Sequence, residues 1–113
     1  MLPLLYLPLA AAYALPGFAK LLAHPKMRHA AAHFDIPWSR YQLLGAAELA
    51  AATGILIGIR WPSIGVAAAI GMILLLLGAL LTHRRAGDPV KEAVPALLLL
   101  AVTIAYLAIA LTH

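Results

Sequence analysis

The chain has 113 residues, the size of one small domain, and 65% of them are hydrophobic. Soluble globular proteins average about 45–50%, and a fold this small has too much surface to bury so many apolar side chains. The eight lysines and arginines outnumber the four acids, but they fall in short segments between apolar tracts, which indicates membrane topology rather than nucleic-acid binding. Cysteine is absent, which excludes disulfides and thiolate metal sites.

Four apolar tracts predict four membrane-spanning helices at about 2–22, 41–59, 63–82 and 90–111. Each is close to the roughly 20 residues that cross a hydrocarbon core of about 30 Å. No Lys or Arg precedes the first tract, so we expect a retained helix rather than a cleavable signal peptide. No tract alternates polar and apolar residues as a membrane β-strand does. The predicted fold class is therefore all-α, an integral membrane up-and-down four-helix bundle in a single domain.

The polar connections predict the orientation. In the first, basic and apolar residues alternate over about 25–34, which is typical of a helix lying at the headgroup level. In the third, Asp88 can cap the last helix and Pro89 can open it. Seven of the eight Lys and Arg residues lie in these two connections. The positive-inside bias then places both connections in the cytoplasm and both termini outside the plasma (inner) membrane.

Glu48 is the most informative residue because it lies about two turns into the second span, where an unpaired carboxylate is costly. Lys20 or Arg84 can balance it, since the ends of all four spans meet in one leaflet. We expect a polar pocket that opens toward the cytoplasm under residues 23–40. The candidate acid–base residues are Glu48, His83 and Lys20, and the candidate ligand-binding residues are His24, Tyr41, Arg84 and Asp88. A structural ion pair that fixes helix register is the alternative.

The histidines raise the question of a metal site. His29 and His33 are four residues apart, with His24 nearby, but solvated imidazoles explain this spacing as well. A metal site would need a third ligand and supporting second-shell contacts, and haem ligation by His83 has no further support. We therefore expect no metal or haem, and no residue spacing specifies another cofactor.

A stripe of small residues runs along the second span at every fourth position: Ala46, Ala50, Gly54 and Gly58. On a helix this stripe lies roughly opposite Glu48. Small residues let helices approach closely in membranes. The stripe therefore either seats a neighbouring helix of the same chain or forms a homo-oligomer interface through Ala50, Gly54 and Gly58.

The order of these features resembles the DoxX-like family of small four-span membrane proteins. The resemblance rests on short segments in the same order along nearly the whole chain: Pro16–Leu21, His24–Met27, Gly45–Leu49 and Leu81–Asp88. It implies a four-helix membrane bundle in which Lys20, Glu48 and His83 match recurring polar positions. Some relatives are linked to quinone-coupled sulfur oxidation or oxidative-stress complexes, and a distant branch resembles receptor-assembly chaperones.

Three functional hypotheses follow. In the first, the protein binds an apolar molecule with a polar head, a quinone being one candidate, around Lys20, Glu48 and His83, and acts as a redox-linked accessory protein. In the second, it is an intramembrane isomerase or hydrolase with Glu48 and His83 as acid and base. In the third, it is an interaction or assembly subunit of a membrane complex. Membrane lipid is a partner in each, and nucleic acid in none.

Overall fold

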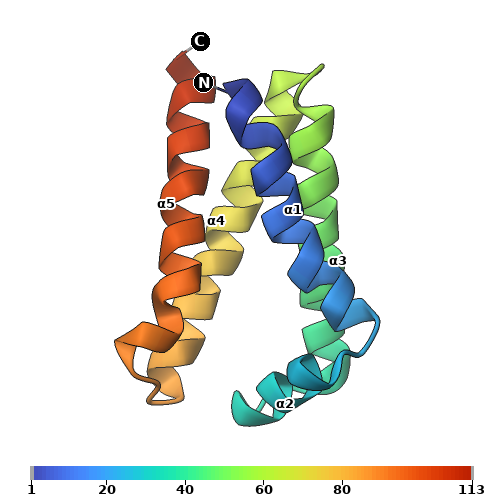
Figure 1. The fold of residues 1–113 in the computed structure, drawn as a ribbon, viewed down its shortest axis with the longest axis vertical. Helices are drawn as coiled ribbons and strands as arrows, with labels where there is room; N and C mark the ends of the chain where they lie inside the picture. Colours follow the sequence, from blue (N-terminus) through green and yellow to red (C-terminus); the bar gives the residue numbers. More distant parts are fainter. Residues whose placement is uncertain (1, 113) are drawn as a thin grey trace.

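The computed structural model describes residues 2–112, which form five helices and no strand. The helices are α1 (Leu2–Leu21), α2 (Pro25–His33), α3 (Trp38–Ile57), α4 (Pro62–Arg85) and α5 (Val90–Thr112) (Figure 1). The four long helices run up and down, and the short α2 lies across one end of the bundle (Figure 1). The all-α fold class predicted from the sequence is confirmed.

Proline marks the start of every helix after the first. Pro25 and Pro62 are the first residues of α2 and α4, Pro37 is the N-cap residue of α3, and Pro89 directly precedes α5. A proline is well suited to this position because its φ is already helical and its missing N–H would have no partner there. α3 begins at Trp38, just before the apolar tract predicted to span the membrane at about 41–59, because Pro37 sets the start of the helix.

The helices α1, α2 and α4 end with the same kind of turn. Ala23, Asp35 and Gly87 follow α1, α2 and α4 with positive φ values of 58°, 56° and 74°. The next amide in each case donates to a carbonyl five residues back, from His24 to Ala19 (2.9 Å), from Ile36 to Ala31 (2.9 Å) and from Asp88 to His83 (3.0 Å). This is the Schellman arrangement of helix C-termini. These turns fix where Asp35 and Asp88 leave their helices.

The outer surface of the bundle is strongly apolar. Between 63% and 72% of the surface of each of five leucines is exposed, namely Leu4, Leu15, Leu43, Leu74 and Leu98. α1, α4 and α5 are long and apolar enough to cross a membrane. α3 has the same length as α1 but is more polar, and it is not among these three. So much contiguous apolar surface indicates a helical membrane bundle rather than a protein facing water.

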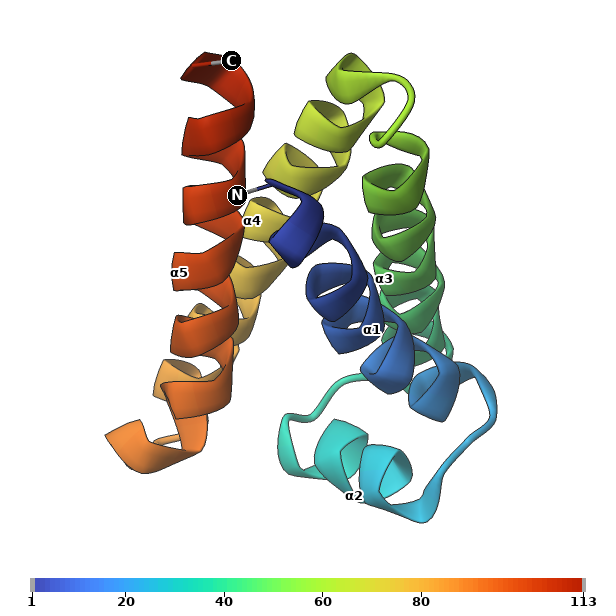
Figure 2. The same cartoon turned by 45° about the horizontal axis from the view of Figure 1, so that its top comes forward.

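The long helices form two pairs. α1 packs along α3 and α4 packs along α5. α4 also packs against α3 to nearly the same extent, and α1 meets α5 over a shorter stretch. The pairs lie close together near the chain termini and diverge toward the end where α2 lies (Figures 1 and 2). Tyr13 donates a buried hydrogen bond of 2.6 Å to Thr103, whose hydroxyl donates to the Leu99 carbonyl at 2.8 Å. This bond joins α1 to α5 where the pairs still touch.

Two glycines of the α3 stripe pack against α4 of the same chain. A Cβ atom at Gly54 would lie 2.6 Å from the Ala68 Cβ, and one at Gly58 would lie 2.7 Å from the Gly65 Cα. Each four-residue step turns the stripe by about 40°, so it winds from the exposed Ala50 toward α4. Packing against α4 accounts for the close contacts at Gly54 and Gly58, and a homo-oligomer interface through Ala50, Gly54 and Gly58 stays a prediction.

Candidate functional site

Two glycines set the distance between α1 and α3. A Cβ atom at Gly17 would lie 2.9 Å from the Gly45 carbonyl oxygen, and one at Gly45 would lie 2.8 Å from the Gly17 carbonyl oxygen. The two backbones therefore approach too closely for any side chain at this crossing. Lys20 and Glu48 each follow one of these glycines by three residues, which places them on the same helix faces as the glycines. The glycine contact thus brings an ammonium group and a carboxylate together.

Lys20 and Glu48 form a mostly buried ion pair. The Lys20 Nζ donates to the Glu48 Oε1, and their side chains are only 12% and 10% exposed. The Lys20 Nζ also lies 5.2 Å from the centre of the Tyr41 ring, within the range of a cation–π contact. Arg84, the other cation considered for this role, lies on the exposed surface. Glu48 thus has the partner that a carboxylate among apolar helices requires.

A cavity of about 720 Å³, which we call the main cavity, lies between the two helix pairs. All five helices contribute to its walls, mostly with leucine, alanine, methionine and proline side chains. Its polar side chains are Lys20, Tyr41, Glu48, Thr82, His83 and Glu92. Sites for small molecules have this size and composition, with a few polar groups that orient the ligand in an apolar chamber.

Pro16 leaves one carbonyl group of α1 without its usual hydrogen bond. A proline inside a helix has no N–H to donate to the carbonyl four residues earlier, which in α1 is that of Ala12. Both residues line the main cavity. The Ala12 carbonyl oxygen therefore has no amide donor from the helix, and Ala12 is one of the residues of the cavity wall.

Two histidines converge on Asp88. The His83 Nδ1 lies 2.7 Å from the Asp88 Oδ2, and the His33 Nε2 lies 2.7 Å from the Oδ1. An ionised carboxylate only accepts hydrogen bonds, so both ring nitrogens donate to it. The hydrogen bond from His33, followed by that from His83, lowers the pKa of Asp88 below its ordinary value of 3.8, against a smaller opposing effect of desolvation. The Nε2 of His83 is then the nitrogen available to other partners.

His33, His83 and Asp88 form a clasp that bridges the diverging helix pairs. α2 packs against α1 and α3, whereas Asp88 lies in the link between α4 and α5. The Phe34 ring adds an edge-on contact to His83, with ring centres 5.1 Å apart. Asp88 was expected to cap α5, but its two oxygens accept hydrogen bonds from the two imidazoles. The clasp connects α2 to the α4–α5 link at the end where the pairs separate.

The residues selected from the sequence separate into two groups. The structure brings Lys20, Tyr41, Glu48 and His83 to the walls of the main cavity. The other three do not line it. The His24 Nδ1 accepts a hydrogen bond of 3.1 Å from the Lys26 amide at the start of α2, Arg84 is exposed, and Asp88 belongs to the clasp. Among residues 2–112, no three His, Asp or Glu side chains are grouped so that they could hold a metal ion.

The chain is similar to a known family of proteins over most of its length. The model described as the DoxX-like family matches residues 4–106, a range that contains the main cavity and the clasp. No curated protein and no solved structure matched the chain.

Proposed function

This chain belongs to the DoxX-like family, and we propose that it binds a membrane-dissolved apolar molecule with a small polar head in the main cavity. The resemblance noted in the sequence is confirmed by the family match. The observation that carries the proposal is the Lys20–Glu48 ion pair on the wall of an otherwise apolar cavity of about 720 Å³. A charge pair that only fixed helix register would not need an open space beside it.

The polar groups of the main cavity suit a quinone-like head. Quinone oxygens are acceptors, and the Lys20 ammonium has three N–H groups, of which Glu48 engages one. A quinol hydroxyl is a donor, for which the Glu48 carboxylate and the Ala12 carbonyl are acceptors. The apolar tail would lie along the leucine and methionine side chains. A protein that holds such a molecule would act as a redox-linked accessory protein.

The proposal includes an arrangement in the bilayer. α3 crosses with the other three long helices, because it packs along α1 and its Leu43 faces outward. Seven of the eight Lys and Arg residues lie near the α2 end, so this end faces the cytoplasm. The main cavity then opens toward the cytoplasmic leaflet of the plasma (inner) membrane, and both termini lie outside.

Lipid extraction and mass spectrometry of the purified protein test this proposal. We expect an apolar molecule to co-purify with the wild type in a fixed ratio and to be lost in Glu48→Gln. Arg84→Gln is the control, because Arg84 is an exposed charged residue that lines neither the main cavity nor the smaller pocket beside it. The proposal fails if the wild type carries no such molecule, or if Glu48→Gln retains it as well as the control does.

A second candidate function, an intramembrane isomerase or hydrolase, is favoured by the bond between His83 and Asp88. A carboxylate that accepts from Nδ1 orients the imidazole and leaves Nε2 as a base, an arrangement that recurs in acid–base catalysis. Glu48 would be the second proton-transfer group. Turnover of a membrane-dissolved substrate that survives both Glu48→Gln and His83→Gln would exclude these roles.

A further inference from the structure

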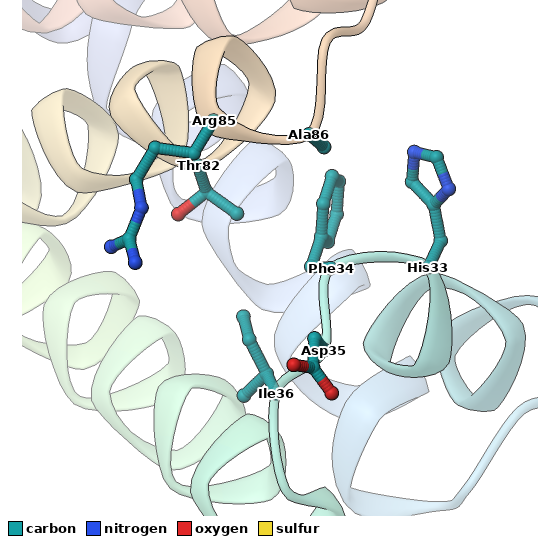
Figure 3. Close-up of a pocket in the computed structure, with 7 residues that line it drawn as sticks. All are labelled: His33, Phe34, Asp35, Ile36, Thr82, Arg85 and Ala86. Carbon is teal, nitrogen blue, oxygen red and sulfur yellow. The ribbon is translucent and has the colours of Figure 1, made fainter.

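A second cavity, which we call the outer pocket, lies beside the main cavity. It has a volume of about 360 Å³ and lies between the end of α4 and the turn from α2 to α3 (Figure 3). Phe34, Ile36 and Thr82 line both cavities. Asp35 and Arg85 line only the outer pocket. The outer pocket therefore has charged groups of its own.

Asp35 and Arg85 are opposite charges that do not pair with each other. Within residues 2–112, neither takes part in an ion pair or a side-chain hydrogen bond. The Arg85 guanidinium extends from α4, and the Asp35 carboxylate comes from the facing turn (Figure 3). Two opposite charges that line one pocket without pairing are complementary to a molecule that carries both charges.

The surface beside the outer pocket is apolar. Leu77 and Leu81 precede Arg85 at intervals of four residues, so the three side chains follow one face of α4. Both leucines are exposed. A hydrocarbon chain lying along these leucines would lead to the Arg85 guanidinium at the end of the helix.

We propose that the outer pocket binds the headgroup of a zwitterionic phospholipid of the phosphoethanolamine type. The phosphate meets the Arg85 guanidinium, whose planar donors match phosphate oxygens. The ammonium group donates to the Asp35 carboxylate, and an acyl chain lies along Leu77 and Leu81. A phosphocholine headgroup fits less well, because its quaternary nitrogen has no N–H to donate. A phosphoglycerol headgroup has no cation for Asp35.

This site is independent of the ligand proposed for the main cavity. Glu48 and Lys20 do not line the outer pocket, and Asp35 and Arg85 do not line the main cavity. Substitutions can therefore separate the two sites. Asp35 and Arg85 are both exposed, so their replacement leaves the packed interior unchanged.

The test measures lipid binding by native mass spectrometry of the full chain in detergent. Phosphatidylethanolamine, phosphatidylcholine and phosphatidylglycerol with identical chains are added to the wild type and to Arg85→Gln, Asp35→Asn, Arg84→Gln and Glu48→Gln. We expect phosphatidylethanolamine to bind the wild type most tightly, and Arg85→Gln to weaken its binding about tenfold or more, as the loss of a charge-assisted hydrogen bond predicts. Asp35→Asn should remove the preference for phosphatidylethanolamine over the other two lipids.

Two variants are controls. Arg84→Gln removes a neighbouring exposed charge that does not line the outer pocket, and Glu48→Gln alters only the main cavity. Both should bind phosphatidylethanolamine like the wild type, even if Glu48→Gln has lost a molecule from the main cavity.

Three results would overturn the proposal. In the first, phosphatidylglycerol binds the wild type as tightly as phosphatidylethanolamine. This would indicate that a basic surface binds the phosphate and that the ammonium group is not recognised. In the second, Arg84→Gln weakens binding as much as Arg85→Gln. In the third, soluble glycerophosphoethanolamine displaces the lipid at an equal concentration, which would identify a water-soluble zwitterion rather than a lipid as the ligand.

Discussion

Lys20 of α1 donates a hydrogen bond to Glu48 of α3 at the point where Gly17 and Gly45 bring the two helices closest together. Each charged residue lies three positions after a glycine, so the backbone contact and the side-chain contact arise from the same helix faces. The glycines thus determine the position of the ion pair on the wall of the main cavity. Four predictions follow from this arrangement and from the clasp.

Removal of one partner of the ion pair should cost more than removal of both. Lys20→Met leaves the buried Glu48 carboxylate without a cation, and breaking such a pair typically costs about 3–5 kcal/mol. The double variant Lys20→Met/Glu48→Gln should recover a large part of this loss. Equilibrium unfolding in mixed detergent micelles measures the free energies of the four proteins. Strictly additive losses would contradict the pairing.

Gly45→Ala should separate α1 from α3. Its new methyl group would lie 2.7 Å from the Lys20 Cβ and 2.8 Å from the Gly17 carbonyl oxygen, and overpacking of this kind costs about 1–3 kcal/mol. Gly71→Ala is the matched control, because nothing lies within 4 Å of a Cβ atom at that position. The control should be neutral or slightly stabilising, since alanine favours the helix. Equal melting temperatures for the two variants would argue against the close glycine contact.

A larger side chain at Ala96 should block the main cavity. Ala96 lies on α5 and lines this cavity, so Ala96→Phe fills space that a ligand would occupy while it leaves the Lys20–Glu48 pair unchanged. The amount of co-purified apolar molecule should fall at least severalfold. Ala101→Phe on the exposed face of α5 should have no such effect. If Ala96→Phe retains as much of the molecule as Ala101→Phe, the molecule binds elsewhere.

The clasp should weaken in acid. The pKa of Asp88 is lowered in the folded protein by the hydrogen bonds from His33 and His83. Its stabilising effect is therefore fully present above the ordinary value of 3.8 and is lost as the pH falls through the lower, folded-state pKa. Asp88→Asn cannot ionise, so the difference in melting temperature between it and the wild type should shrink below pH 3.8. A difference that is unchanged at lower pH would contradict the role of the ionised carboxylate.

The sequence predicted much of the fold because charge-free tracts and prolines mark the long helices directly. It also placed Lys20, Glu48 and His83 at one end of the bundle. In an up-and-down bundle, the end of one helix lies at the same side as the start of the next. It left the choice between Lys20 and Arg84 open. Gly17 and Gly45, each three residues before a member of the pair, could have indicated that Lys20 is the partner of Glu48. That conclusion requires the two glycines to be in contact, and this contact depends on the tertiary structure.

The clasp and the outer pocket could not be predicted in the same way. His33 reaches Asp88 only because α2 turns back across the end of the bundle, and that path depends on left-handed turns at Ala23 and Asp35. Residues other than glycine rarely adopt a left-handed conformation, so the local sequence does not predict these two turns. The buried bond between Tyr13 and Thr103 likewise joins residues 90 positions apart, and neither residue has a distinctive sequence context.

The most direct test of ligand binding in the main cavity is equilibrium binding of a short-chain quinone to the protein in lipid nanodiscs. The wild type and the control Arg84→Gln should bind it saturably at one site per chain. Glu48→Gln and Lys20→Met should weaken binding by about tenfold or more, because each removes a charged group from the cavity wall. Binding that does not saturate, or that is equally strong in all four proteins, would show that the cavity around Lys20 and Glu48 is not the site.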